Sequence, residues 1–364
     1  MKKLIIACMA LTLIAEVNAQ KRPFTAYDYT EASSLTMVGK MMPGTPNPYH
    51  LADTCRFKGF TALENQQVRL SAGLSIAFRT NSPTIVIYTD FILASVDLTD
   101  GSGTMGRGYC MYIKKNGQWI FAAAEKLSMH HLSDTMRLGT LMDTTMKECL
   151  LYLPLSSEER SIQIGTEKGS RIEALSNPFR HRIAVYGSSF TRGTSSARPG
   201  MGYAEQFARH TGLQTVSMGC NGNARLQPYF ADLLCAVEAD AFLLDVFSNP
   251  TPDEMRERFF PFLDKIRRAH PGVPIIFQQT IRRERRNFDL EEDALEEAKM
   301  RTADSLMAIA VKRYEDVYYV RPEIDDPRHL STVDGIHPDN YGYYLWAKSI
   351  EKPVLKILKK YGIR

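Results

Sequence analysis

The first half of the chain shows the alternation of apolar and polar positions that is typical of β-strands. Apolar or alternating runs recur between Phe24 and Asn177, and no long helical pattern interrupts them. We predict strands at Val68–Leu70, Leu74–Phe78, Thr84–Tyr88, Tyr109–Ile113, Trp119–Phe121, Glu148–Leu153 and Ser161–Ile164. Asn116-Gly117 separates two of these runs and predicts a tight hairpin turn. The pattern as a whole predicts an all-β sandwich or jelly roll.

After Pro178, short apolar strands alternate with helical patterns. The predicted strands are Ile183–Tyr186, Gln214–Met218, Ala241–Phe247, Val273–Gln279 and Val317–Val320. The predicted helices are Tyr203–Thr211, Pro228–Glu238, Pro252–Ala269, Leu290–Arg313 and Asp339–Lys360. This alternation predicts an α/β domain with a parallel sheet covered on both faces. We therefore divide the chain into a β-sandwich domain of residues 20–177 and an α/β domain of residues 178–364.

Residues 1–19 have the pattern of a signal peptide. Lys2 and Lys3 precede the apolar run Leu4–Ile14, and a small-residue cleavage site ends at Ala19. A weak lipobox ends at Cys8, but cleavage there would leave almost no apolar stretch before it. No later segment reaches the roughly 18 apolar residues of a membrane span. We predict a periplasmic or secreted protein without a stable membrane anchor.

Composition and charge exclude some classes of function. The chain is 44% hydrophobic and 24% charged, as in globular proteins, and its net charge of +4 comes from interspersed residues of both signs. This distribution argues against nucleic-acid binding. Five cysteines follow residue 19, without a CxxC pair: Cys55, Cys110, Cys149, Cys220 and Cys235. We expect buried free thiols, with one bridge in the first half as the alternative.

Four short blocks place polar residues at one rim of the predicted sheet. Gly187–Gly193, Gly219–Asn223 and Phe247–Pro250 each follow a predicted strand, where reactive groups of parallel sheets collect. Asp334–Pro338 lies in the loop before the last helix, which can reach the same rim. Together, and in this order, the blocks resemble those of the SGNH/GDSL hydrolase family. The resemblance covers the second half and implies a flavodoxin-like, three-layer domain.

The resemblance also implies catalytic roles. The family nucleophile falls on Ser189, and Ser188 occupies the position where the family more often has Asp. His337 would be the base, and Asp334 would accept its Nδ1–H and fix the tautomer. On the first block alone, the two serines could instead cap the next helix. That alternative weakens once a base and oxyanion donors are present.

The implied oxyanion hole has three donors. They are the backbone N–H groups of Ser189 and Gly222 and the side-chain amide of Asn249. A glycine at position 222 would let the backbone approach the reacting carbonyl closely. His130-His131 has no partner at metal-ligand spacing and no HExxH motif occurs, so we predict neither a metal nor another cofactor.

The first half resembles the N-terminal β domain of a bacterial subgroup of these hydrolases, whose signature is Gly-x-Asp-Leu-Tyr followed by Asn-Gly-Lys-Trp. Here Gly108–Tyr112 and Asn116–Trp119 match, with Cys110 in place of Asp, Met111 in place of Leu and Gln118 in place of Lys. Similar two-domain architectures occur among carbohydrate esterases. The resemblance thus implies a secreted serine esterase that removes O-acetyl groups from carbohydrates. The alternatives are a lipid or thioester hydrolase, or a non-catalytic glycan-binding protein.

Two further features leave their interpretation open. Arg282–Arg286 contains four arginines and could bind an anionic glycan at the rim, although charge runs are usually solvated loops. Tyr203, Phe247 and Tyr341 are aromatic residues near the rim, and such residues are more often core than sugar platforms. The expected partner is a small-molecule or glycan ester, and the oligomeric state is left open.

Overall fold

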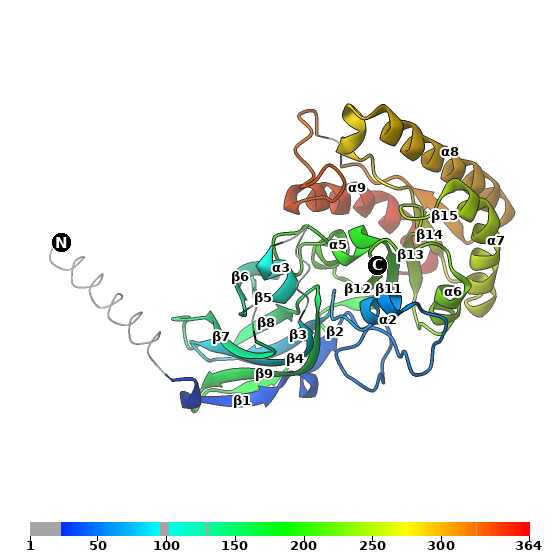
Figure 1. Cartoon of the computed structure of the whole chain (residues 1–364). Coiled ribbons are helices and arrows are strands. Elements are labelled where there is room, and N and C mark those ends of the chain that lie inside the picture. Colours follow the sequence, from blue (N-terminus) through cyan, green and yellow to red (C-terminus); the bar gives the residue numbers. More distant parts are fainter. Residues whose placement is uncertain (1–22, 95–101, 129–130, 325) are drawn as a thin grey trace.

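The computed structural model describes residues 23–94, 102–128, 131–324 and 326–364. The predicted signal peptide of residues 1–19, together with Cys8 and His130, lies outside these residues. Two antiparallel sheets come first along the chain, and a parallel sheet with helices follows (Figure 1), as predicted. None of the described helices is long and apolar enough to cross a membrane.

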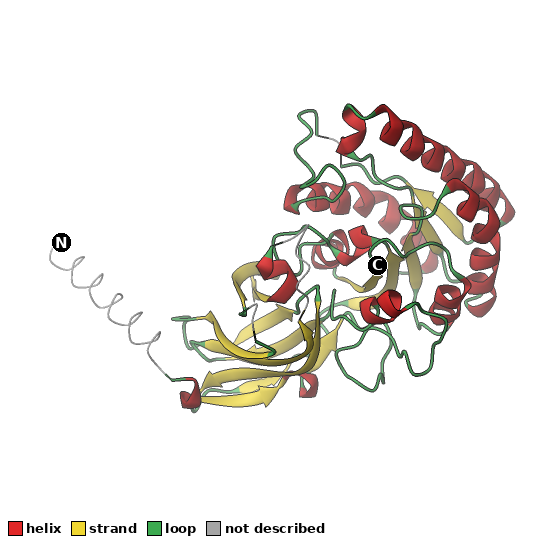
Figure 2. Ribbon diagram, in the orientation of Figure 1, coloured by secondary structure: helices red, strands yellow, loops and turns green. Residues whose placement is uncertain are grey.

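The first half is a β-sandwich. Its strands are β1 (Tyr27–Glu31), β2 (Thr36–Val38), β3 (Ser75–Thr80), β4 (Ile85–Ala94), β5 (Gly108–Lys115), β6 (Gln118–Lys126), β7 (Ser133–Gly139), β8 (Lys147–Tyr152), β9 (Ser157–Glu167) and β10 (Ile172–Ala174). One sheet has the order β1-β9-β4-β7, and the other has the order β10-β3-β8-β5-β6, with β2 beside β3. Figure 2 shows the two sheets as stacked layers. Ile87 and Ile164 from one sheet and Ile76 and Leu151 from the other are buried in a common core.

Short helices accompany the sandwich, and the turn after one of them stands where a strand was predicted. They are η1 (Phe24–Ala26), η2 (Ala32–Ser34), α2 (Ala62–Gln67) and α3 (Gly103–Arg107). The strand predicted at Val68–Leu70 is wrong, because these residues form the turn that follows α2. Val68 and Leu70 are both buried in this turn, so apolar positions alternate along the sequence as they do in a strand. The Asn116-Gly117 hairpin is confirmed, with φ angles of 52° and 79° between β5 and β6.

The second half contains one parallel sheet. Its strands are β11 (Arg180–Gly187), β12 (Leu213–Gly219), β13 (Ala241–Asp245), β14 (Ile275–Gln278) and β15 (Val317–Val320). Its helices are α4 (Ser189–Arg192), α5 (Tyr203–Thr211), α6 (Pro228–Cys235), α7 (Pro252–Ala269), η3 (Glu284–Asn287), α8 (Leu290–Arg313), α9 (Asn340–Leu358) and η4 (Lys359–Tyr361). The strand order β12-β11-β13-β14-β15 is that of flavodoxin-like sheets.

Both faces of this sheet are covered, as the apolar runs predicted. Ile183 and Val185 of β11 point to the face that packs against α5 and α9. Ala184 and Tyr186 point to the opposite face, which packs against α6, α7 and α8. The buried cluster on this second face continues without a break into the sandwich core. The two halves therefore share one hydrophobic core as well as polar contacts.

The five cysteines among the described residues are free thiols. Cys110, Cys149 and Cys220 are buried, as expected, whereas Cys235 is half-buried and Cys55 is exposed. Burial raises the pKa of Cys110 to about 11 and that of Cys149 to about 12, so these two thiols stay protonated at neutral pH.

Candidate active site

Three of the four sequence blocks begin at the same edge of the parallel sheet. The register pairs Gly187 at the end of β11 with Gly219 of β12 and with Asp245 of β13. The loops that follow these strands therefore leave the sheet side by side. The fourth block, before α9, reaches this edge through His337, whose ring contacts the residue that begins α4.

Ser189, His337 and Asp334 form a hydrogen-bonded series. The Oγ atom of Ser189 lies 3.0 Å from Nε2 of His337, and Nδ1 of His337 lies 2.8 Å from Oδ2 of Asp334. Because an ionised carboxylate only accepts, Nδ1 carries the proton and Nε2 is free to accept from Ser189. A hydroxyl, an imidazole and a carboxylate in this order form an arrangement that activates a nucleophile.

The ionisation of Asp334 follows from its hydrogen bonds. Its Oδ1 accepts the backbone N–H groups of Ile336 and His337, at 2.9 and 2.7 Å. Partial burial alone would raise the pKa of this carboxyl. The N–H bonds from the backbone and ring of His337 and from Ile336 outweigh burial, and the pKa lies below its ordinary value. Asp334 is therefore charged at neutral pH and fixes both the loop and the imidazole.

The two adjacent serines have different positions. Ser188 is the N-cap of α4, because its Oγ accepts the N–H of Phe190 at 3.2 Å. Ser189 is the first residue of the helix, and only its side chain contacts His337. The capping interpretation thus holds for Ser188 and fails for Ser189. The residue before the two serines, Gly187, must lack a side chain, because a Cβ there would lie 2.6 Å from the carbonyl oxygen of Asp245.

Asp245 is a site residue that the sequence blocks do not include. It is completely buried at the end of β13, and its Oδ2 accepts both the N–H (3.2 Å) and the Oγ–H (2.7 Å) of Ser188. Thr191 and Ser248 also donate to its carboxylate, at 3.2 and 2.7 Å. Burial raises the pKa of Asp245 although these bonds oppose the shift. One acidic residue in an otherwise apolar strand was the signal that could have identified it.

Two of the three residues proposed as oxyanion donors lie in the loops after β12 and β13, and the third, Ser189, begins α4. Gly222 has a φ of +69°, and a Cβ there would meet nothing within 4 Å. The backbone angle, rather than crowding by protein atoms, therefore explains this glycine. The Oδ1 atom of Asn249 accepts the N–H of Ala224 at 3.2 Å. That bond fixes the amide orientation and leaves the Nδ2–H₂ end of Asn249 as a donor.

The loop that contains Asp334 and His337 is fixed by η3. Glu284 accepts the N–H and the Oγ–H of Ser331, at 3.0 and 2.8 Å, and also the hydroxyl of Thr332. The backbone N–H of Arg285 donates to the carbonyl of Gly335 at 2.8 Å. Glu284 is not predictable from the sequence pattern, because it is the only acidic residue among the arginines of Arg282–Arg286.

Two arginines of Arg282–Arg286 form ion pairs within the protein. Arg283 lies 3.1 Å from Glu296 and also donates to the carbonyl of Ser248 at 2.9 Å. Arg286 is buried and pairs with Asp293 and Glu297, at 2.7 and 3.0 Å. The expectation of a solvated loop is therefore wrong for Arg283 and Arg286, whereas Arg285 is exposed.

The three aromatic residues near the rim differ in exposure. Phe247 and Tyr203 are completely buried, and Tyr203 stacks on Trp346 with ring centroids 4.5 Å apart, so both belong to the core as expected. Tyr341 is 43% exposed, and its hydroxyl donates to Asp326 at 3.2 Å.

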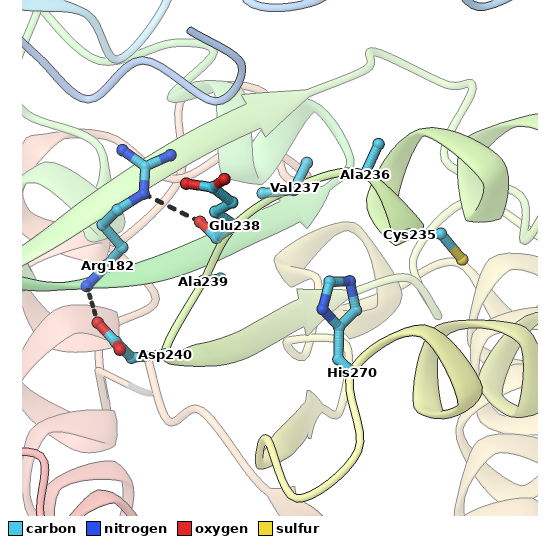
Figure 3. Close-up of a pocket in the computed structure, with 8 residues that line it drawn as sticks. All are labelled: Arg182, Cys235, Ala236, Val237, Glu238, Ala239, Asp240 and His270. Atoms are coloured by element: carbon cyan, nitrogen blue, oxygen red, sulfur yellow. Dashed lines mark hydrogen bonds between the residues drawn. The ribbon is translucent and has the colours of Figure 1, made fainter.

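A separate hollow of about 460 Å³ lies at the other end of the sheet. Figure 3 shows it beside Arg182, near the start of β11, where the guanidinium Nε donates to the carbonyl of Glu238 and the backbone N–H donates to Asp240. Arg182 also donates to the carbonyls of Lys40 and Met41 in the first half of the chain. The hollow lies at the amino ends of the strands, opposite Ser189, and the residues that line it all belong to the second half.

A flavodoxin-like sheet with Ser189, His337 and Asp334 at its carboxyl edge is the arrangement of an SGNH-type hydrolase. Residues 180–356 match the GDSL-like lipase/acylhydrolase family, and residues 27–172 match the N-terminal domain of SGNH hydrolase-type esterases. No curated protein matches the sequence.

Solved structures of similar proteins extend over nearly the whole chain. A GDSL-like lipase from Bacteroides ovatus is 32% identical, with a TM-score of 0.86, and the match covers 92% of this chain and 98% of that one. The salicylyl-acyltransferase SsfX3 of a tetracycline biosynthetic pathway is 19% identical, with a TM-score of 0.68 over 93% of this chain and 99% of that one. An acetyl xylan esterase from Butyrivibrio proteoclasticus is 12% identical, with a TM-score of 0.54 over 91% of this chain and 99% of that one.

The chain belongs to the SGNH/GDSL hydrolase family and is a carboxylic ester hydrolase. Its first half is the β domain that the subgroup signature predicted.

Proposed function

We propose that this protein is a secreted serine esterase that removes O-acetyl groups from carbohydrates through an acyl-enzyme. The observation that supports the mechanism is the 3.0 Å contact between Ser189 Oγ and His337 Nε2, with Asp334 behind the imidazole. This geometry also argues against a pure glycan-binding protein, since binding alone requires no activated hydroxyl.

In the proposed reaction, Ser189 Oγ attacks the ester carbonyl carbon while its proton moves to Nε2 of His337. Asp334 stabilises the resulting imidazolium. The negative charge on the former carbonyl oxygen is stabilised by the N–H groups of Ser189 and Gly222 and by the Asn249 amide. The bond to the alcohol oxygen then breaks, and His337 protonates that oxygen. A water molecule, deprotonated by His337, attacks the acyl group, releases acetate and restores Ser189.

The acetylated carbohydrate is supported by the architecture. A β domain followed by an SGNH domain is shared over nearly the whole chain with a protein described as an acetyl xylan esterase. The protein from Bacteroides ovatus is described as a GDSL-like lipase, so a lipid or thioester hydrolase is the second candidate. Because the alternatives differ in the acyl group, substrate specificity separates them.

The mechanism is tested by replacing the proposed nucleophile. Ser189→Ala removes the attacking oxygen, and we expect kcat for 4-nitrophenyl acetate to fall by about 10⁴-fold or more, as for other triad members. A fluorophosphonate should label the wild type at Ser189, identified by peptide mass spectrometry, and should leave the variant unlabelled. Wild-type activity in a pure preparation of Ser189→Ala would refute the mechanism.

The acyl group is tested with a chain-length series of 4-nitrophenyl esters and with acetylated oligosaccharides. We expect acetate to give the highest kcat/KM, with release of acetate from the oligosaccharides. A higher kcat/KM for long acyl chains would favour the lipid hydrolase.

Export remains a proposal that rests on the pattern of residues 1–19. We expect the mature chain to begin at Gln20, as determined by N-terminal sequencing of the protein purified from the periplasm or medium. An uncleaved chain in the cytoplasm would exclude export.

A further inference from the structure

A glutamine of the β-sandwich half contacts the loop that contains Gly222. Gln67 is the last residue of α2 and is only 5% exposed. Its Nε2 donates to the carbonyl oxygen of Asn221 at 3.0 Å, and its Oε1 accepts from Nδ2 of Asn223 at 3.1 Å. One side-chain amide therefore bonds to the residues on both sides of Gly222.

The bond to Asn221 determines where the Gly222 N–H points. The carbonyl of Asn221 and the N–H of Gly222 belong to the same peptide group, which is planar and trans, so the two bonds point in opposite directions. A donor that fixes the carbonyl on one side thus fixes the N–H on the other. Without such a bond this peptide could rotate, because glycine at 222 restricts its own backbone angles least of all residues.

We propose that Gln67 is a positioning residue of the oxyanion hole, which orients the N–H of Gly222 toward the reacting carbonyl. This inference rests on the proposed function, because it takes Gly222 as an oxyanion donor. Nδ2 of Asn223 also donates to the Asn221 carbonyl, at 2.9 Å, so this oxygen accepts two hydrogen bonds. Donors on the carbonyl polarise the peptide group and strengthen its N–H as a donor.

The helix that presents Gln67 is itself fixed at both ends. At its start, Thr61 and Glu64 form a capping box. Glu64 is also buried and accepts hydrogen bonds from Gln227 and Tyr229, each at 2.9 Å. These two residues belong to the second half, directly after the Gly222 loop.

The far end of α2 is joined to the sandwich. Arg69 follows α2 and lies 3.1 Å from Glu158 of β9, which is 3% exposed. Burial alone would raise the pKa of Glu158, but its bonds with His50 and Arg69 outweigh this and lower it, so the pair is charged. Gln67 is therefore presented by a segment with defined partners in both halves.

The role is tested with two substitutions of similar size. Gln67→Met removes both hydrogen bonds. Gln67→Glu retains an acceptor for Asn223 but places a carboxylate against the carbonyl of Asn221. Misplacing a catalytic group by about 1 Å can cost about 10²-fold. We expect kcat for 4-nitrophenyl acetate to fall by roughly 10- to 10²-fold in both variants, with KM within about twofold of wild type.

Two further measurements separate positioning from loss of fold. Phenylboronic acid forms a tetrahedral adduct with a reactive serine and presents an oxygen to the oxyanion hole, so its affinity should fall by a factor similar to that for kcat. The fraction of protein that a fluorophosphonate titrates at Ser189 should remain that of the wild type. Gln66→Met, on the same helix, is the matched control and should retain wild-type kcat.

Wild-type kcat in both Gln67 variants would overturn the proposal. A fall in kcat that merely equals a loss of titratable Ser189 would also overturn it, because the role would then be structural. A wild-type protein that neither hydrolyses the ester nor reacts with the fluorophosphonate would refute the proposed function itself, independently of the Gln67 variants.

Discussion

The two loops that complete the candidate site are fixed in different ways. The loop with Asp334 and His337 is fixed from within the α/β half, where Glu284 bonds to Ser331, 47 residues away. The loop with Gly222 is fixed from the β-sandwich half, where Gln67 bonds to Asn221, 154 residues away. The proposed proton transfer thus depends on one half of the chain, whereas one of the proposed oxyanion donors depends on contact between the halves.

This difference shows that the β half is more than an appended module. The hydrophobic core is continuous between the two halves, and Glu64 and Gln67 bond to the segment from Asn221 to Tyr229. Substitutions on the two sides of the site should therefore have separable effects. Three experiments test this distinction.

The largest effect is expected for Asp334→Asn, on the proton-transfer side. An amide at this position can no longer favour the tautomer with a proton on Nδ1 of His337, and we expect kcat to fall by about 10⁴-fold. Steady-state kinetics with 4-nitrophenyl acetate measures the effect, and circular dichroism checks the fold. A loss below tenfold in a folded variant would show that the Ser189–His337 pair suffices without its carboxylate.

A smaller effect is expected for Asn249→Ala, on the oxyanion side. Removal of one oxyanion donor costs roughly 10²–10³ in kcat. KM should change little, because the lost bond forms mainly in the transition state. If the variant raised KM and left kcat unchanged, Asn249 would be a ground-state binding residue instead.

The smallest catalytic effect is expected for Glu159→Gln, a substitution in the sandwich that leaves α2 untouched. Glu159 is completely buried, and burial raises its pKa from the ordinary value of 4.5 to about 8. Between these values the folded state binds more protons than the unfolded state, so the stability of the wild type falls as pH rises, by up to about 1.4 kcal/mol per pH unit.

The Glu159→Gln variant has no carboxyl at this position, so this pH-dependent change in the free energy of unfolding is absent. Urea unfolding at pH 5 and pH 8 should show that the variant gains stability relative to wild type as pH rises, while kcat is unchanged. Parallel pH dependences for the two proteins would contradict the assignment. Unchanged kcat would show that contact with the Gly222 loop, rather than location in the β half, determines the effect on catalysis.

The fold and the motif residues were predictable because they are encoded locally. Apolar runs such as Ile183–Tyr186 and the turn signal Asn116-Gly117 require only neighbouring residues, and the four blocks follow strands in a fixed order. Ser189 and His337, 148 residues apart, came together because parallel strands align their carboxyl ends.

The supporting residues were not predictable in the same way. Asp245, Glu284 and Gln67 act through partners that only the tertiary structure brings near, and each lies in a segment with another dominant pattern. The missed helix α2 illustrates this, because Val68 and Leu70 in the turn after it gave the alternation of a strand.

The six-residue helix α2 has a consequence for how the two halves are inherited and engineered. A chimaera that combined this α/β half with the β domain of a relative would keep Ser189, Asp334 and His337. It would still lose one of the two donors to the Asn221 carbonyl, unless the donor domain supplied an equivalent of Gln67. Recombination at the boundary between the halves thus separates residues that act together. For this chain, the unit that can be exchanged intact is the pair of halves.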